Sequence, residues 1–416
     1  MVKSLKNFTS NLNCKKSSNL NVLYIHHCGV WGGASRSLFQ AVKQIQRKSV
    51  NPFLICPYGN VNEITKSLKI PTINVLGISQ FANQKLGDYF GHRWLLLLRE
   101  TFFIPFSFYA LIIAKIKWGR KIDLIHVNEY SLIFIGIITK YLFRKPLVIH
   151  VRSIQATEHV LRCWFLDLLA KLFAVSVIAI DQAVANSLSN SVVTTVIHNG
   201  ETPKDTIKTG VKTAAAHEIT FGIVANFLAF KGIYEFVEAA KACVREKGVS
   251  NAKFMIFGDN HRQQKGFKAF LFRKLGFLSD VKKDIINYIE KENLIEFIEL
   301  KGFVADIKDI YGRFDVLCFP SHLNAVGRPV FEAAFFGKPS IVAFRDRSED
   351  EGIIHQSTGL IIREKDPGDL ADAMLYFIRN PHSANKMGIA AKKLAENKFN
   401  IEKNAEKLLK IYQQIK

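Results

Sequence analysis

Residues 315–344 read DVLCFPSHLNAVGRPVFEAAFFGKPSIVAF and contain a complete strand–loop–helix–strand unit. An apolar run ends at Pro320, and a polar loop follows it. A helix is predicted to begin at Pro329, because proline is favoured in the first helical turn. Gly337 and Pro339 end this helix before a second apolar run. This order of elements predicts two parallel strands joined through a helix, as in α/β folds.

The same alternation of short apolar runs and helical patterns fills two blocks of the chain, and this unit belongs to the second. Strands alternating with helices predict parallel sheets covered on both faces. The predicted fold class is therefore α/β, with two Rossmann-like domains whose parallel sheets face a central cleft. The predicted strands are residues 22–26, 53–56, 122–126, 147–151, 177–180 and 193–197 in the first block, and 219–224, 254–257, 297–300, 316–319 and 340–344 in the second.

Breaks in these patterns predict the domain boundaries. Residues 199–217 have no apolar periodicity and are expected to be a linker. The predicted organisation has five parts: a flexible basic arm at 1–20, an N-terminal domain at 21–198, the linker, a C-terminal domain at 218–396 and an amphipathic helix at 397–416. The arm has no apolar core of the kind found in signal peptides.

Composition limits the kind of protein. The 416 residues are 48% hydrophobic and 22% charged, which excludes a disordered chain. The six cysteines are far apart and form no CxxC pair, so a reduced cytosolic protein without a thiolate metal site is expected. The formal net charge of +21 indicates an anionic partner. No basic-aromatic nucleic-acid module is recognisable, so an acidic membrane surface or a phosphorylated substrate is favoured.

The most apolar segment is WLLLLRETFFIPFSFYALIIAKI at residues 94–116. Arg99 and Glu100 interrupt the run that a membrane-spanning helix requires. Two alternatives remain open. The segment is either a buried core helix or an interfacial helix whose phenylalanines enter lipid beside basic flanks.

The loop and helix start at residues 322–332 have the chemistry of a diphosphate site. A helix N-terminus offers unpaired N–H groups and a positive dipole, and Gly327 permits close approach of a ligand. Glu332, one turn into the helix, can present its carboxylate to ribose hydroxyls. Its neighbours are apolar, and carboxylates in such surroundings usually have a partner.

This stretch resembles the donor-binding signature of the retaining family 4 glycosyltransferases of GT-B fold. Glu332 matches the second glutamate of the signature, which in the family holds the ribose, and Gly327 matches its loop glycine. Asn324 stands where the family has its first glutamate, which contacts sugar hydroxyls. The resemblance implies that residues 324–328 (Asn324, Ala325, Val326, Gly327 and Arg328) bind the donor.

A second match, GIVANFLAFKGIYEFVEAA at residues 222–240, implies that Lys231 neutralises the leaving diphosphate. Asn226 replaces an arginine of the family pattern, so Arg328 is considered as a compensating cation. Gly258 and Phe303 match shorter family segments after the next two predicted strands.

In the first block, Gly32 and Gly33 resemble the family's N-terminal glycine loop, which meets the diphosphate. His150 and Arg152 at a strand end are both candidates for a functional position that the family often fills with histidine. Together with Lys231 and Glu332 they form the predicted catalytic set.

The resemblance implies a retaining glycosyltransferase that uses a UDP- or GDP-linked sugar as substrate, with no cofactor and no metal. It also implies that the terminal helix returns to the first domain. With the aromatic segment and the positive charge, it leads us to expect a lipid-linked saccharide acceptor, a place on the cytoplasmic face of the plasma membrane, and a role in capsule, lipopolysaccharide or other envelope polysaccharide synthesis. Two alternatives are a GT-B sugar-nucleotide epimerase and a non-catalytic sugar-nucleotide-binding protein.

Overall fold

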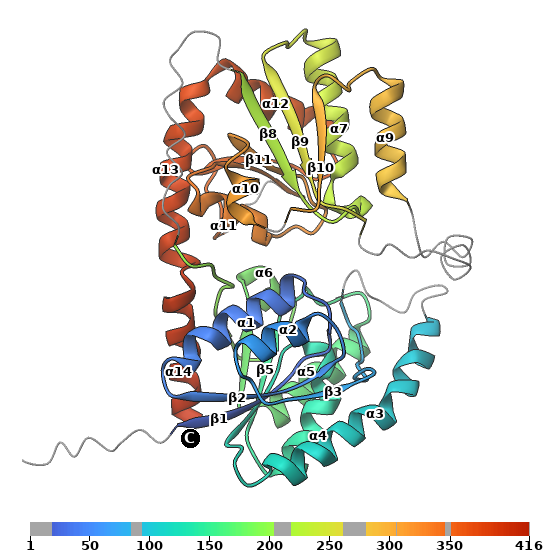
Figure 1. Ribbon diagram of the computed structural model, residues 1–416, viewed down its shortest axis with the longest axis vertical. Helices are drawn as coiled ribbons and strands as arrows, with labels where there is room; N and C mark the ends of the chain where they lie inside the picture. Colours follow the sequence, from blue (N-terminus) through green and yellow to red (C-terminus); the bar gives the residue numbers. More distant parts are fainter. Residues whose placement is uncertain are drawn as a thin grey trace, which may run out of the picture. The chain divides into compact units, whose positions relative to one another are not determined.

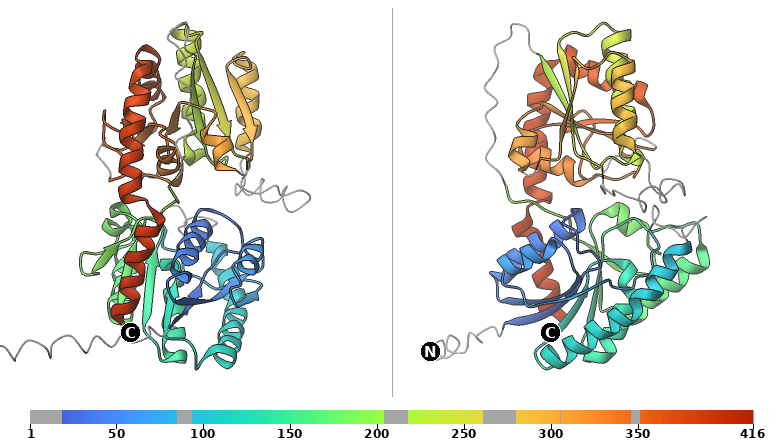
Figure 2. Two further views of the ribbon diagram at one scale, coloured as in Figure 1. Left: turned by 60° about the vertical axis from the view of Figure 1, so that its left-hand side comes forward. Right: turned by 45° about the vertical axis from the view of Figure 1, so that its right-hand side comes forward.

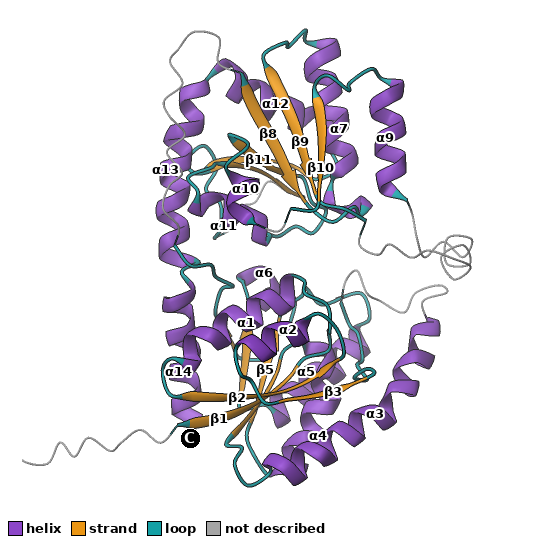
Figure 3. Cartoon of the chain, in the orientation of Figure 1, coloured by secondary structure: helices purple, strands orange, loops and turns teal. Residues whose placement is uncertain are grey.

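The computed structural model describes residues 19–84, 94–203, 218–260, 280–304, 306–345 and 351–415, and it divides into two compact units. Unit 1 comprises Met1–Gly200 with Ile401–Lys416, and unit 2 comprises Glu201–Asn400. Each unit is a sheet with helices on both of its faces (Figures 1 and 3). Most of the predicted arm, residues 1–18, and most of the predicted linker, residues 204–217, lie outside the described residues.

The sheet of unit 1 is entirely parallel and has the strand order β3-β2-β1-β4-β5-β6-β7. Its central strands are buried on both faces, which explains their continuous apolar sequences. β3 was not among the predicted strands. The bounds are β1 Leu20–Ile25, β2 Val50–Pro57, β3 Thr72–Val75, β4 Leu124–Val127, β5 Leu147–Val151, β6 Ser176–Ala179 and β7 Thr194–Val196.

Two groups of helices cover this sheet. One face packs against α1, α2 and α14, and the other against α3, α4 and α5. α6 and the short 3-10 helix η2 lie in connections after strands. The bounds are α1 Gly33–Gln46, α2 Val61–Ser67, α3 Leu95–Trp118, η2 Tyr130–Leu132, α4 Ile133–Phe143, α5 Val160–Phe173, α6 Gln182–Asn186 and α14 Ile401–Ile415.

The sheet of unit 2 is also parallel, with the order β10-β9-β8-β11-β12-β13. α7, its π-helical continuation η4, α9 and α12 contribute to the core on one face, α10 and α11 to the other, and α13 packs on α11. β13 was not predicted. The bounds are β8 Ile219–Val224, η3 Ala229–Lys231, α7 Ile233–Lys241, η4 Ala242–Glu246, β9 Ala252–Phe257, α9 Val281–Lys291, β10 Ile298–Gly302, α10 Ile307–Tyr311, β11 Val316–Phe319, α11 Arg328–Phe335, β12 Ser340–Phe344, β13 Gly359–Arg363, α12 Pro367–Arg379 and α13 Pro381–Lys398.

The terminal helix begins later than residue 397, where the sequence placed it. α13 continues to Lys398, and α14 starts at Ile401. Between them, the Phe399 ring stacks on Phe331 of unit 2 with centroids 4.8 Å apart, and Asn400 bridges to Glu201. These contacts place residues 399 and 400 in unit 2, whereas α14, which follows them, packs beside α1 in unit 1. Glu201, which was predicted to lie in the linker, likewise belongs to unit 2.

The apolar segment is one continuous helix, α3, and the alternative of a buried core helix is wrong. Only 22% of its most apolar 18 residues are buried. α3 packs on β3 and α4 through Ala110, Leu111 and Ala114. Phe106, Ile113 and Trp118 are partly buried against the same core, and Phe102, Phe108 and Ile112 are among the apolar side chains that are exposed. By length and composition this helix could cross a membrane, and it is the one such helix among the described residues.

Candidate functional site

In unit 2, the loop between β11 and α11 forms the predicted anion site. Gly327 is the N-cap residue of α11, and no side chain caps the helix. A side chain at Gly327 is excluded, because its Cβ would lie 2.4 Å from the Phe319 ring. Helix N-termini attract anions through unpaired N–H groups and the helix dipole. The start of α11 therefore has the geometry of a phosphate site.

Glu332 is buried and held on both oxygens. The residue is 5% exposed. Tyr311 donates its hydroxyl to Oε2 at 2.8 Å, and Arg328 donates Nε and Nη2 to Oε1 at 3.0 and 2.9 Å. Arg328 also pairs with Glu201, at 3.3 Å. Because two carboxylates already engage this guanidinium, less of its charge is available to a diphosphate than the sequence suggested.

Asn324 occupies the position of the first glutamate in the donor-binding signature. Its backbone has a left-handed conformation. Its φ is 51°, a conformation that asparagine tolerates better than most residues. Its Oδ1 accepts the backbone N–H of Arg345 at 2.8 Å. Since the carbonyl oxygen is used in this way, the side-chain NH₂ is the group that Asn324 offers to a sugar hydroxyl. Ala325 and Val326 continue the same half-buried loop.

Lys231 ends the short helix η3 beside this loop. Gly232 follows with φ 78°, and a Cβ there would lie 2.0 Å from the Pro320 carbonyl oxygen. His322 donates its backbone N–H to the Phe230 carbonyl at 2.9 Å, which joins the two loops. Lys231 is half-buried, and burial lowers the pKa of its ammonium group. The structure thus brings Lys231 close to the segment that leads into α11.

Three strand ends of unit 2 meet at Gly258. Its φ is 137°, and a Cβ would lie 1.8 Å from the carbonyl oxygen of Ala225. The Gly258 N–H donates to Gly302 at 2.8 Å, and Phe303 follows with 78% of its surface exposed. Asn226, after β8, is also exposed. These predicted donor residues therefore share the carboxyl edge of the sheet, where open α/β sheets bind ligands.

In unit 1, Gly32 is the N-cap residue of α1, again with no side-chain cap, and Gly33 is the first residue of the helix. No atom lies within 4 Å of where a Gly32 Cβ would be, so the space in front of the helix is open. The sequence reasoning missed a neighbouring requirement. Gly29 and Gly59 pack backbone to backbone, and a Cβ on Gly29 would lie 2.3 Å from the Tyr58 carbonyl oxygen.

Arg152 is the centre of the polar cluster at the ends of β4 and β5. It donates Nε to Asn128 Oδ1 at 2.6 Å and Nη1 to Asn199 Oδ1 at 2.8 Å. Its Nη2 lies 3.3 Å from His150 Nδ1. His150 is only 4% exposed, and its Nε2 is buried with no hydrogen-bond partner in the described part of the chain. Of the two candidates, Arg152 is the more accessible.

The histidines under this edge are electrically neutral. Burial lowers the pKa of His126 to about 3 and that of His27 to about 4, and it holds the pKa values of His26 and His150 well below the ordinary range. The positive charge of Arg152 lowers all four further. At neutral pH these histidines therefore add no positive charge to that of Arg152.

Glu129 is a candidate residue that the sequence analysis did not select. Its Oε1 accepts the Tyr130 N–H at 2.8 Å and the Ser153 hydroxyl at 3.1 Å. Burial raises the pKa of Glu129 to about 7, although these hydrogen bonds oppose the shift. A carboxyl group that titrates near neutrality can accept or donate a proton in catalysis. The signal available in the sequence was its place directly after a strand, in HVNE.

The described residues contain no group of three or more His, Cys, Asp or Glu side chains that could hold a metal ion. The structure brings Lys231, Gly258, Phe303, Glu332 and the 324–328 loop to one sheet edge of unit 2. It brings His150 and Arg152 together at the corresponding edge of unit 1.

Comparisons with known proteins find a family match that includes the proposed anion site of unit 2. Residues 204–394 match the family model described as Glycosyl transferases group 1. The chain is 26% identical over 150 residues to an alpha-1,3/1,6-mannosyltransferase of Mus musculus, covering 34% of this chain and 35% of that protein. It is 23% identical over 192 residues to a poly(ribitol-phosphate) alpha-N-acetylglucosaminyltransferase of Staphylococcus aureus, covering 46% and 34%. The chain thus spans about a third of the length of these curated relatives.

Among solved structures, Anabaena HepE in complex with UDP superposes with a TM-score of 0.72 at 21% identity, over 95% of this chain and 100% of that chain. The predicted α/β fold with two parallel Rossmann-like domains of GT-B type is confirmed. The residues that match the glycosyltransferase family model, 204–394, begin just after Thr202 and Pro203 and so fall within unit 2.

Proposed function

We propose that this protein is a retaining glycosyltransferase that moves a sugar from a nucleoside diphosphate to a lipid-linked saccharide. The observation that carries the proposal is the uncapped start of α11, where Gly327 leaves room for a ligand and Glu332 is held one turn away. This site lies inside the region that matches the glycosyltransferase family model. No metal or other cofactor is proposed.

The donor is proposed to bind at the carboxyl edge of unit 2. The first-turn N–H groups of α11 and the ammonium group of Lys231 would stabilise the charge that develops on the departing diphosphate. Fixed dipoles and charges aimed at such charge are often the largest catalytic contribution. Glu332, fixed by Tyr311 and Arg328, would accept hydrogen bonds from the ribose. Asn324 would donate its NH₂ to the sugar.

The acceptor is proposed to bind unit 1, with Arg152 as its contact and Gly32 and Gly33 providing N–H groups for phosphate. His150 would act as a positioning residue, since it is buried against Arg152. The exposed apolar surface of α3, followed by exposed Lys117, supports a peripheral place on an anionic membrane at its cytoplasmic face. Envelope polysaccharide synthesis is the setting that this combination favours.

The test is nucleoside diphosphate release by the purified full chain from a panel of UDP- and GDP-linked sugars, with and without membrane lipid extract. UDP-linked sugars come first, because a protein of the same fold binds UDP. We expect one donor to give release that depends on extract and that falls at least 100-fold in Glu332→Gln. Glu290→Ala, an exposed position on α9, is the matched control and should keep full activity.

A non-catalytic sugar-nucleotide-binding protein is the second candidate. It is favoured by Asn226 and Asn324, which stand where the family has charged residues. Donor binding without release in any extract would establish this alternative. Conversion of a sugar nucleotide to its epimer without an acceptor would instead establish an epimerase, and absence of donor binding would overturn all three.

A further inference from the structure

We propose that a hollow between α3 and α4 receives the hydrocarbon chain of the lipid that carries the acceptor. This inference rests on the proposed lipid-linked acceptor and adds where its chain binds. α3 and α4 lie side by side in unit 1 (Figure 2). The hollow between them has a volume of about 290 Å³.

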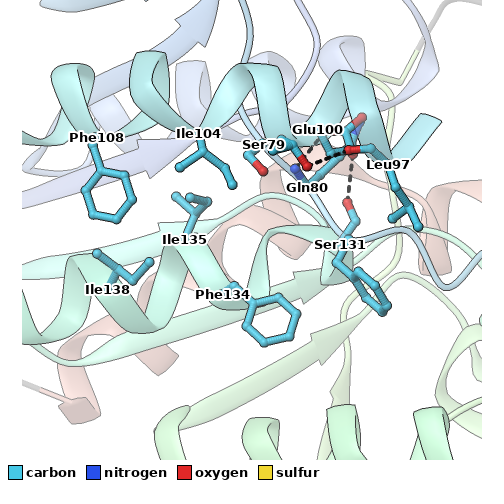
Figure 4. A pocket seen from close by; sticks show the side chains of 12 residues that line it. Ser79, Gln80, Leu97, Glu100, Ile104, Phe108, Ser131, Phe134, Ile135 and Ile138 are labelled. Carbon is cyan, nitrogen blue, oxygen red and sulfur yellow. Dashed lines mark hydrogen bonds between the residues drawn. The ribbon is translucent and has the colours of Figure 1, made fainter. Parts of the chain in front are cut away.

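The hollow has a polar end and an apolar end (Figure 4). Ser79, Gln80, Glu100 and Ser131 gather at one end. Apart from Thr101 the remaining wall is apolar, including Ile104, Phe108, Ile135 and Ile138. A lining of this kind fits a molecule with one polar end and a hydrocarbon tail. A free saccharide would need polar groups along the whole wall, because buried sugar hydroxyls require hydrogen-bond partners.

Hydrogen bonds fix the side chains at the polar end of the hollow. Glu100 Oε2 accepts the backbone N–H of Gln80 at 2.9 Å, and its Oε1 accepts Arg99 Nε at 2.9 Å. The Ser131 hydroxyl donates to Gln80 Oε1 at 3.0 Å. Glu100 is almost fully buried, and its charge is balanced by Arg99. This end therefore suits the polar start of a headgroup and excludes the middle of a hydrocarbon chain.

The polar end lies beside the proposed acceptor site. Ser131 follows Glu129 by two residues, and Glu129 accepts the Ser153 hydroxyl next to Arg152. Gln80 follows β3, so the two segments approach the hollow from the carboxyl edge of the sheet. A chain lying along the hollow would therefore bring its headgroup to the edge where Arg152 sits.

The surface around the hollow suits a lipid bilayer. Phe102, Tyr109 and Ile112 of α3 are exposed, as are Leu161 and Trp164 of α5. The edge-on contact between Phe81 and Phe134 and the tilted contact between Phe134 and Phe165 continue this apolar surface from the hollow to α5. Exposed basic residues lie in the last turn of α3 and directly after it: Lys117, Arg120 and Lys121. Apolar side chains beside basic ones are complementary to anionic lipid. The hydrocarbon chain of a lipid could therefore enter the hollow from the membrane.

The volume sets the expected length of chain. A cavity of about 150 Å³ binds one benzene ring, so a hollow of twice that size should hold roughly a dozen carbon atoms. A longer chain would leave its remainder in the bilayer. Affinity should therefore rise with chain length up to about ten carbons and then level off.

The test titrates hexyl, octyl and decyl phosphate into the full chain by calorimetry, below their micelle concentrations. Wild-type affinity should rise roughly tenfold for every two methylene groups. Ile104→Trp, which fills the hollow from α3, should remove this dependence, and Ile138→Trp should do the same from α4. Ile112→Trp is the matched control on α3. Ile112 is 52% exposed against 41% for Ile104, but it does not line the hollow. Thermal melting establishes that each variant is folded.

Equal affinity for hexyl and decyl phosphate in the wild type, or unchanged decyl phosphate binding in both hollow-filling variants, would overturn the proposal. Donor turnover measured on the same samples separates this failure from that of the proposed function. Chain-length dependence without any donor turnover keeps the hollow and rejects the transferase. Turnover with a lipid acceptor but without chain-length dependence keeps the transferase and rejects the hollow as the binding site of the hydrocarbon chain.

Discussion

The hydroxyl of Tyr412 lies 2.7 Å from Nδ1 of His126, although 286 residues separate them in the sequence. Tyr412 comes from α14, the last helix, and His126 from β4 in the centre of the first sheet. Tyr24 extends the contact with a hydroxyl 3.1 Å from that of Tyr412. The ring of His126 lies edge-on to His150, which contacts Arg152. The C-terminal helix is thus connected to the proposed acceptor site through buried polar groups.

Tyr412→Phe should lower the free energy of unfolding by about 1–3 kcal/mol, because a buried histidine loses its partner. Urea denaturation followed by fluorescence measures this loss. Tyr24→Phe leaves the Tyr412–His126 contact in place and should cost less. Equal effects of the two substitutions would show that the contact with His126 contributes little.

Arg152→Gln should lower the rate of sugar transfer about 100-fold, the effect of removing one preorganised charge-stabilising group. Donor affinity, measured by calorimetry with the nucleoside diphosphate, should stay within a factor of two. Arg144→Gln removes an exposed arginine elsewhere in unit 1 and should leave the rate unchanged. A rate loss in both variants would indicate a general effect of charge instead of a role for Arg152.

Lys231→Ala should weaken nucleoside diphosphate binding about tenfold, the range for one hydrogen bond to a charged group. Lys241→Ala is the control. That residue pairs with Glu292 on the surface at 2.8 Å and should have no effect on binding. Isothermal titration of UDP and GDP into both variants tests the difference. Unchanged binding in Lys231→Ala would remove this lysine from the donor site.

Glu129→Gln should change how stability depends on pH. In the folded state the pKa of Glu129 is raised to about 7, against an ordinary value of 4.5. Between pH 4.5 and 7 the folded protein therefore retains a proton that the unfolded chain releases. The contribution of Glu129 to the free energy of unfolding falls as pH rises through this range. The loss is about 3 kcal/mol in total. The glutamine variant should gain stability relative to the wild type over that window.

Urea denaturation at pH 4.5, 5.5, 6.5 and 7.5 measures this difference. The buried histidines act in the opposite direction. Because their pKa values are lowered in the folded state, they reduce the free energy of unfolding as pH falls below 6.5. Comparing variant with wild type at each pH cancels their contribution. A difference between Glu129→Gln and the wild type that does not change with pH would contradict the raised pKa of Glu129.

Phe102→Asp should weaken binding to phosphatidylglycerol vesicles at least tenfold, because it places a charge on the apolar surface of α3. Ile389→Asp changes an apolar residue of unit 2 that is 66% exposed, against 56% for Phe102, and serves as the control. Vesicle co-sedimentation at 50 and 300 mM salt also tests the basic flank, whose contribution should fall at the higher salt concentration. Equal binding by both variants would place the membrane contact elsewhere.

Much of the fold was predictable from the sequence because its signals are local. The unit at residues 315–344 formed as expected, with α11 beginning at Arg328 beside Pro329 and ending before Gly337. β3 and β13 were missed. β3 and β13 are edge strands of four and five residues. Such short segments carry too little periodicity to be recognised alone.

The sequence by itself determined the parallel sheets, the glycines at Gly232, Gly258 and Gly327, and the strand ends that carry polar residues. Tertiary structure decided what these residues do. Neutral His150 and the raised pKa of Glu129 arise from burial by segments far away in the sequence. The outward face of α3 was equally undetermined, because an apolar helix has the same sequence pattern whether protein or lipid covers it. Burial depends on what packs against a residue, and no local pattern contains that information.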